Sequence, residues 1–213
     1  MPRFAYALML LSALAACQVP PAVVPEASGT FTTTIPLDAD AVWRGEPDTC
    51  RGDVGPVDDC LRATMEAAGA SPMALAASAR MAERGEAGYI ARWQTIEGIG
   101  VATTEFPFRA NTNQGTWLVD AARRISDVDA DPLAAADSNH ADVVAFRAAH
   151  PEALAFAPAR LEARTPLDDG GMRLVFVTPM RTCHACADVG TLRVGYDFDD
   201  ARRFTGRQVI ALR

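Results

Sequence analysis

The chain has 213 residues, of which 49% are hydrophobic and 22% charged, a composition typical of a folded globular protein and not of a disordered one. Its formal net charge is −7, and all 20 basic residues are arginine. An acidic protein repels phosphate backbones, so the composition argues against a nucleic-acid partner. The length permits one large domain or two small ones.

The first 17 residues form a distinct segment. Arg3 precedes an apolar run over residues 4–14, and Leu14-Ala15-Ala16-Cys17 closes that run. The run is too short to span a bilayer as a permanent helix, and small residues stand where a signal peptidase cuts. The segment resembles the lipobox signal of bacterial lipoproteins. An ordinary secretory signal with a chance cysteine, or a buried helix, is the alternative interpretation.

The resemblance to lipoproteins implies a cellular location. Residues 1–16 would be removed, and Cys17 would carry a diacylglyceryl thioether and an amide-linked acyl chain such as palmitate. More than one acyl chain anchors a protein stably in a lipid bilayer. Gln18 stands where an acidic residue would mark inner-membrane retention under the enterobacterial pattern. We therefore expect a periplasm-facing protein held by its lipid, at the outer membrane in preference to the inner one.

Four cysteines remain once Cys17 is assigned to the lipid: Cys50, Cys60, Cys183 and Cys186. In an oxidising compartment such residues form disulfides. Four cysteines allow three connectivities, and spacing does not select one of them rigorously. We favour Cys50–Cys60 and Cys183–Cys186 because each pair is local in sequence.

The first half of the mature chain, residues 30–130, follows a Pro-rich tether at 18–29. A β-branched strand is predicted at 30–35 and a long loop at 36–56, which Trp43 pins to the core. Acidic residues after Pro56, and Ser71-Pro72 as N-cap and first residue, predict two helices. Turn residues then separate four strands. The helices are expected at 56–69 and 71–85, and the strands at 89–96, 101–108, 116–120 and 123–128.

The second half, residues 131–213, repeats this order. Short helices are predicted at 131–136 and 138–150, followed by strands at 159–165, 172–178, 191–198 and 204–212. We therefore predict an α+β fold with two four-stranded antiparallel meanders, each preceded by a short helical pair. A shift of 72 residues aligns Pro107 with Pro179 and Arg109 with Arg181. A tandem repeat explains these matches, and so does convergence at strand ends.

The motif Cys183-His184-Ala185-Cys186 resembles the active dithiol of thioredoxin-like oxidoreductases. In that family the motif opens a long helix, whereas here a strand-like segment follows it. We therefore predict a structural disulfide and keep thiol–disulfide exchange as an alternative function. A zinc site would need a fourth ligand, for which His140 and His150 are the candidates. No metal or other cofactor is predicted.

Asp127-Val128-Asp129-Ala130-Asp131 is similar to the start of a calcium-binding loop. Pro132 stands where the loop needs glycine, and Ser138 where it needs glutamate. The match therefore fails, and we assign no calcium to this segment.

No motif for a nucleophilic serine, a phosphate-binding loop or an HExxH metal site occurs, so no catalytic residue is predicted and binding is favoured over catalysis. Rigid loops at strand ends are common recognition surfaces. The tandem architecture resembles the β-lactamase inhibitory protein, and the cysteine-bracketed loops resemble periplasmic lysozyme inhibitors. These likenesses imply a protein partner, with a structural envelope role as the alternative. The candidate binding residues are Arg109, Asn111, Asn113, Arg181 and His184.

Overall fold

The computed structural model describes residues 30–32, 36–52 and 55–213. The predicted signal, the lipidation site Cys17 and the tether therefore lie outside the described residues, as do positions 33–35 of the first predicted strand. Within the described ranges, no helix combines the length and the apolar character that a membrane span requires.

Groups of short helices alternate with groups of strands along the described part of the chain. In chain order they are β1 Thr30–Thr32, η1 Ala39–Ala41, η2 Pro47–Cys50, α1 Val57–Ala67, α2 Pro72–Ala82, β2 Tyr89–Ile96, β3 Ile99–Glu105, β4 Gln114–Val119, β5 Arg124–Asp127, η3 Ala135–Asn139, α3 Ala141–Ala149, β6 Leu154–Ala155, β7 Arg160–Pro166, β8 Met172–Arg181, β9 Gly190–Phe198 and β10 Phe204–Leu212.

These strands form two five-stranded antiparallel sheets. Sheet A has the order β1-β5-β4-β3-β2, and sheet B has the order β10-β9-β8, with β6 and β7 both paired to β8. Each sheet contains one of the predicted meanders, β2 to β5 in sheet A and β7 to β10 in sheet B. The prediction of an α+β fold with two meanders is confirmed.

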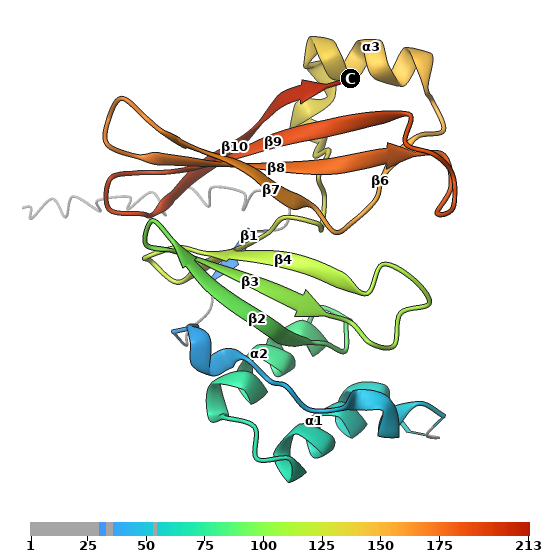
Figure 1. Cartoon of the computed structure of the whole chain (residues 1–213), viewed down its shortest axis with the longest axis vertical. Helices are drawn as coiled ribbons and strands as arrows, with labels where there is room; N and C mark the ends of the chain where they lie inside the picture. Colours follow the sequence, from blue (N-terminus) through green and yellow to red (C-terminus); the bar gives the residue numbers. More distant parts are fainter. Residues whose placement is uncertain (1–29, 33–35, 53–54) are drawn as a thin grey trace, which may run out of the picture.

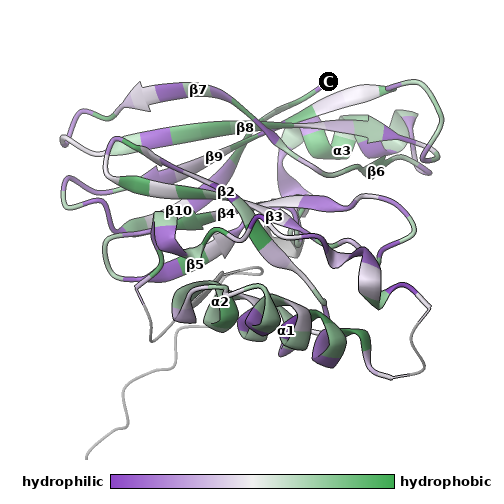
Figure 2. Cartoon of the chain, turned by 60° about the horizontal axis from the view of Figure 1, so that its bottom comes forward, coloured by the Kyte–Doolittle hydropathy of each residue, from purple (hydrophilic) through white to green (hydrophobic). Residues whose placement is uncertain are grey.

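The two sheets stack face to face, with α1 and α2 against the other face of sheet A and α3 beside one end of sheet B (Figure 1). Figure 2 shows α1 and α2 side by side under sheet A. Strand register explains this layering. Val101 lies opposite Leu118, and both side chains join the core between the sheets, whereas the next pair, Ala102 and Trp117, packs toward α2. Sheet A is therefore buried on both faces.

The first helical pair forms as its end signals predict. Ser71 Oγ accepts a hydrogen bond from the backbone N–H of Ala74, and Pro72 occupies the first helical position. This is the arrangement expected of an N-cap followed by proline. Trp43 is buried and packs edge-on against the ring of Tyr89, with 4.8 Å between the two ring centroids. The long loop is therefore held against the core, as predicted.

The second predicted helical pair differs from the structure. Residues 131–134 form no helix, and the last two residues of the predicted span begin the 3-10 helix η3 at Ala135–Asn139. The guanidinium of Arg207 on β10 donates to the carbonyl oxygens of Asp131 (2.7 Å) and Pro132 (3.3 Å) and pairs with the carboxylate of Asp137. Carbonyls that a helix would use internally are therefore bonded to a distant strand.

Helix α3 begins later than the predicted residue 138, because His140 is its N-cap and accepts a hydrogen bond from Asp142 N at 3.3 Å. The matched prolines of the 72-residue shift also differ in setting. Pro107 follows the end of β3, whereas Pro179 lies within β8 opposite Thr191.

Both predicted cysteine pairs lie at disulfide-bond distance. The Cα atoms of Cys50 and Cys60 are 5.7 Å apart, and those of Cys183 and Cys186 are 5.1 Å apart. The first pair links η2 to α1 and so ties the long loop to the helical layer. The second lies in the loop between β8 and β9.

Asp120 joins the two sheets at one end of β4. Its carboxylate accepts hydrogen bonds from the backbone N–H of Arg124 (2.7 Å), from Arg124 Nε (3.0 Å) and from the backbone N–H of Phe204 in sheet B (2.8 Å). The Asp120 side chain is 1% exposed, so these donors replace water entirely.

Asp120→Ala should lower the free energy of unfolding by about 3–5 kcal/mol, because it leaves buried donors on both sheets without an acceptor. Asp48→Ala is the matched control. It removes a carboxylate that is 74% exposed and paired with Arg51, and should cost less than about 1 kcal/mol. Urea unfolding measures both values, and equal losses would contradict the assignment of Asp120 as an inter-sheet bond.

Candidate functional site

One end of the sheet stack is closed by turns from both sheets. The guanidinium of Arg202 donates to the carbonyl oxygen of Glu97 in the β2–β3 turn (2.6 Å) and to that of Gly170 in the β7–β8 turn (3.1 Å). The carbonyl of Arg202 accepts from Ala121 N at 3.0 Å. The turns of sheets A and B therefore seal this end.

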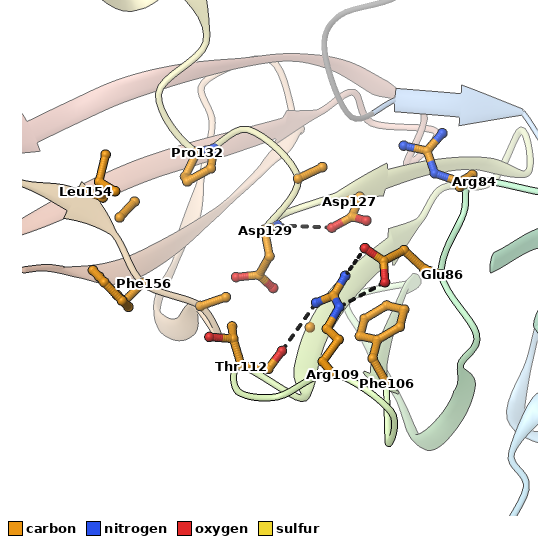
Figure 3. Close-up of a pocket in the computed structure, with 14 residues that line it drawn as sticks. Arg84, Glu86, Phe106, Arg109, Thr112, Asp127, Asp129, Pro132, Leu154 and Phe156 are labelled. Atoms are coloured by element: carbon orange, nitrogen blue, oxygen red, sulfur yellow. Dashed lines mark hydrogen bonds and ion pairs between the residues drawn. The ribbon is translucent and has the colours of Figure 1, made fainter. Parts of the chain in front are cut away.

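At the opposite end, the structure contains a cavity of about 460 Å³ between the two halves of the chain. Its polar side is formed by Arg84, Glu86, Arg109, Asp127 and Asp129. Pro132, Leu154 and Phe156 form an apolar wall that faces them (Figure 3).

A second cavity of about 600 Å³ adjoins the first and shares Asp129, Pro132 and Leu154 with it. Leu133, Phe146 and Met180 make this second part largely apolar. We call the two cavities together the inter-sheet groove, with a polar part and an apolar part. Leu154 is 65% exposed at their junction.

Asp129 lies at the centre of the polar part and bonds both halves of the chain. One carboxylate oxygen accepts from the backbone N–H of Thr116 on β4, and the other from that of Ala159 before β7, each at 2.8 Å. Asp127 accepts from Asp129 N (3.1 Å) and from the indole Nε1 of Trp117 (3.1 Å). Each carboxylate oxygen retains capacity for a further donor.

Burial raises the pKa of Asp129 to about 7, and the negative charge of Asp127 acts in the same direction. The two backbone N–H groups and Arg109 oppose this rise. Burial also raises the pKa of Asp127, against the hydrogen bond from Trp117. Perturbed carboxyl groups in a cavity are a frequent mark of functional sites.

Arg109 lies across the polar part from Asp129, but its hydrogen bonds go elsewhere. Its Nε and Nη2 atoms meet the two carboxylate oxygens of Glu86 at 3.0 and 2.8 Å, and Nη1 donates to the carbonyl of Thr112 at 3.2 Å. The guanidinium also lies 3.9 Å from the ring centre of Phe106. Arg109 is thus held in place by Glu86 and Phe106 and does not bond Asp129 directly.

On β3, near the polar part, the hydroxyl of Thr104 is fully buried and has no hydrogen-bond partner among the described residues. It lies next to Gly115, which lines the polar part. A Cβ atom at Gly115 would lie 2.8 Å from Thr104 Oγ1, 3.4 Å from Phe106 Cε2 and 3.5 Å from Asp129 Oδ2. A side chain at Gly115 would therefore clash with Thr104 and crowd Phe106 and Asp129, so only glycine lets β4 pass this close to them.

The predicted binding residues divide between this groove and other surfaces. Arg109 lines the polar part. Arg181 and His184 flank Phe156 on the other wall, with the guanidinium 6.0 Å and the imidazole centroid 5.7 Å from its ring. Asn113 lines a separate cavity beside Trp43 and Tyr89, and Asn111 is exposed.

The residues of the groove that were not predicted as binding residues include Arg84, Glu86, Asp127, Asp129 and Phe156. The alternation Asp127-Val128-Asp129 at the end of β5 was a usable signal, because residues two apart in an extended chain point the same way. Phe156 is an isolated aromatic residue between short elements, and its pattern contains no comparable signal.

The candidate metal ligands are not brought together. His140 caps α3, and the ring of His150 lies 4.9 Å from that of Phe146 at the other end of this helix. Cys183 and Cys186 are in the β8–β9 loop, where they are bonded to each other. Within the described ranges, no group of three or more His, Cys, Asp or Glu side chains is arranged to hold a metal ion.

No known protein family, curated protein or solved structure matches this chain.

The carboxyl group of Asp129 should titrate with a midpoint near pH 7 in the folded protein, compared with an ordinary value of 3.8. Because the folded state then binds the proton more tightly than the unfolded state, the contribution of Asp129 to stability falls as pH rises between these values and is constant above them. Asp127→Asn removes the neighbouring charge and should lower the midpoint. Carboxyl ¹³C NMR measures it, and a midpoint near 4 in the parent protein would refute the assignment.

Thr104→Val should raise the free energy of unfolding by about 1 kcal/mol, because it replaces a buried hydroxyl that lacks a partner with a methyl group of similar size. Thr205→Val, at an exposed position of β10, is the control and should change stability little. Chemical denaturation distinguishes the two, and a destabilised Thr104→Val protein would mean that the hydroxyl is bonded in the native state.

Proposed function

We propose that this chain is the precursor of a lipid-anchored envelope protein and that its folded domain acts by binding a segment of a partner protein in the inter-sheet groove. The lipobox-like segment ending at Cys17 supports the anchor. The Cys50–Cys60 and Cys183–Cys186 pairs support an oxidising compartment, because such pairs persist outside the reducing cytosol.

The main support for binding is the inter-sheet groove itself. It lies at an open end of the sheet stack and combines titratable groups with an adjoining apolar cavity. Leu154 and Ala155, which line both parts, form the two-residue edge strand β6. Edge strands offer backbone groups to an extended peptide, and neighbouring cavities then select its side chains. An edge strand beside a polar and an apolar cavity therefore suits the binding of an extended segment of a partner protein.

The setting of Cys183 and Cys186 favours binding over thiol–disulfide exchange. The pair lies in the loop that connects the antiparallel strands β8 and β9, and a strand follows it in place of a helix, so it lacks the helix amino terminus that lowers a thiol pKa in thioredoxin-like enzymes. His184 contacts Phe156 of the groove wall, which gives this loop a supporting role at the binding surface.

Photo-crosslinking in the organism that encodes the chain tests both parts of the proposal. A photoreactive residue at Leu154 should give one adduct of discrete mass with another protein. The same residue at Ile210, which is 39% exposed and adjoins Gly195 of sheet B away from the groove, should not. Cys17→Ser should release the protein from the membrane fraction.

Adducts that are identical at both positions, or absent at Leu154, would count against groove binding and favour a structural envelope role. A Cys17→Ser protein that still fractionates with the membrane would count against the lipid anchor.

A further inference from the structure

Resting on the binding function proposed above, we infer that the partner segment pairs as an added strand with the backbone of Ala155 on β6. One large apolar side chain of that segment then enters the apolar part of the inter-sheet groove.

The hydrogen-bond pattern of β6 shows which of its backbone groups are turned outward. The backbone N–H of Phe156 donates to the carbonyl oxygen of Pro179 on β8 at 2.9 Å. Ala155 lies opposite Met180, whose carbonyl oxygen is turned the other way and accepts from Val189 N at 2.8 Å. In antiparallel strands, residues that bond a given neighbour alternate with residues that do not. The N–H and C=O of Ala155 therefore point away from β8.

These two groups lie at the groove. Ala155 lines both the polar and the apolar part, and β6 is the last strand at this edge of sheet B. Within the described part of the chain, no loop backbone group or side chain bonds the N–H or C=O of Ala155. One residue of an extended segment can satisfy both, because its N–H and C=O point to the same side of its own strand.

The ladder available to the segment is short. By the same alternation Ala157 is the next residue turned outward, and Pro158 follows it without an N–H group. Ala159 then donates to the carboxylate of Asp129 at 2.8 Å and leaves the edge. So few backbone bonds give little affinity alone, and a side chain of the segment must supply the rest.

The face of β6 decides the character of that side chain. Residues that lie opposite each other in a sheet have their side chains on the same face, so Ala155 shares the face of Met180, which is buried between the sheets. A residue paired with Ala155 therefore directs its side chain to the same interior. The apolar part receives it there, lined by Leu133, Phe146 and Met180. A leucine, methionine or phenylalanine suits these walls.

The residues on either side of the central one point to the opposite face, beside Leu154, which is 65% exposed. That face is open to solvent and accepts polar residues. The inferred target is therefore an extended segment with one large apolar residue between residues of free choice.

The test uses the full chain in detergent micelles and capped peptides of sequence Thr-Ser-X-Ser-Thr, where X is leucine or aspartate. The leucine peptide should move the amide proton signal of Ala155 downfield in NMR spectra and slow its exchange with solvent. The aspartate peptide should bind at least tenfold more weakly, because its charge would enter the apolar part.

Two N-methylated forms of the leucine peptide test the backbone pairing on the unmodified protein. N-methylation of the leucine removes the N–H that donates to Ala155 O and should weaken binding about tenfold. N-methylation of the following serine removes an N–H that faces away from β6 and should change affinity less than twofold.

Ala155→Pro removes the outward N–H while the bonds of β6 to β8 remain, and should weaken the leucine peptide about tenfold. Ala155→Ser keeps the N–H and is the matched control. The NMR signal of the buried Trp117 indole N–H reports whether each variant keeps the native packing.

Equal effects of the two N-methyl groups, or a leucine peptide that leaves the Ala155 signal in place, would overturn the inference. So would equal affinity for the leucine and aspartate peptides, or no binding of either. In each of these cases a discrete adduct at Leu154 in the organism would still support groove binding, so the two proposals fail separately.

Discussion

Two aspartates tie strand β4 of sheet A to sheet B at its two ends, and the rest of the structure depends on these ties. At one end Asp120 accepts from Phe204 N of β10. At the other, Asp129 bonds Thr116 N on β4 and Ala159 N before β7. The hydrophobic effect that drives the packing of the two sheets is non-directional. Directional bonds from buried carboxylates to backbone N–H groups of both sheets set the position of one sheet on the other, and hence the shape of the groove.

The two ties are placed in different surroundings. Asp120 has the guanidinium of Arg124 against it and belongs to the end of the stack that the turns around Arg202 close. Asp129 has no such contact from Arg109, which is committed to Glu86, and it borders a cavity. A buried carboxylate without a bonded cation is costly, and the rise in its pKa expresses that cost. The side chain that holds the sheets together at this end is therefore also one whose ionisation is opposed by burial.

Local patterns were sufficient to predict most elements of the fold. The strands of both meanders were predicted as strand-like segments bounded by turn residues, and β2 spans the predicted residues 89–96. The cysteine pairing was predicted for a similar reason, since each pair is local in sequence. The helix predicted at 131–136 is displaced to the 3-10 helix η3 at Ala135–Asn139, and Arg207, more than 70 residues away, bonds the carbonyls of Asp131 and Pro132 that precede it. Helix propensity is a weak preference, and a tertiary contact of this kind overrides it.

The candidate site was predictable only in part, because it is made by the stacking of the sheets and not by any one segment. Arg109 was selected as a strand-end residue, but Glu86, which holds it, precedes β2, and Phe156 comes from the other half of the chain. Asp127 and Asp129 were considered only as calcium ligands, since their alternation indicates a shared side but not what faces it. What faces them is set by the hydrogen bonds of Asp129 to Thr116 and Ala159, positions 43 residues apart. A groove of this origin cannot open or close without disturbing the packing of the sheets, so its ligand should bind to a largely preformed surface. Such a ligand binds only the folded state and should therefore raise the free energy of unfolding.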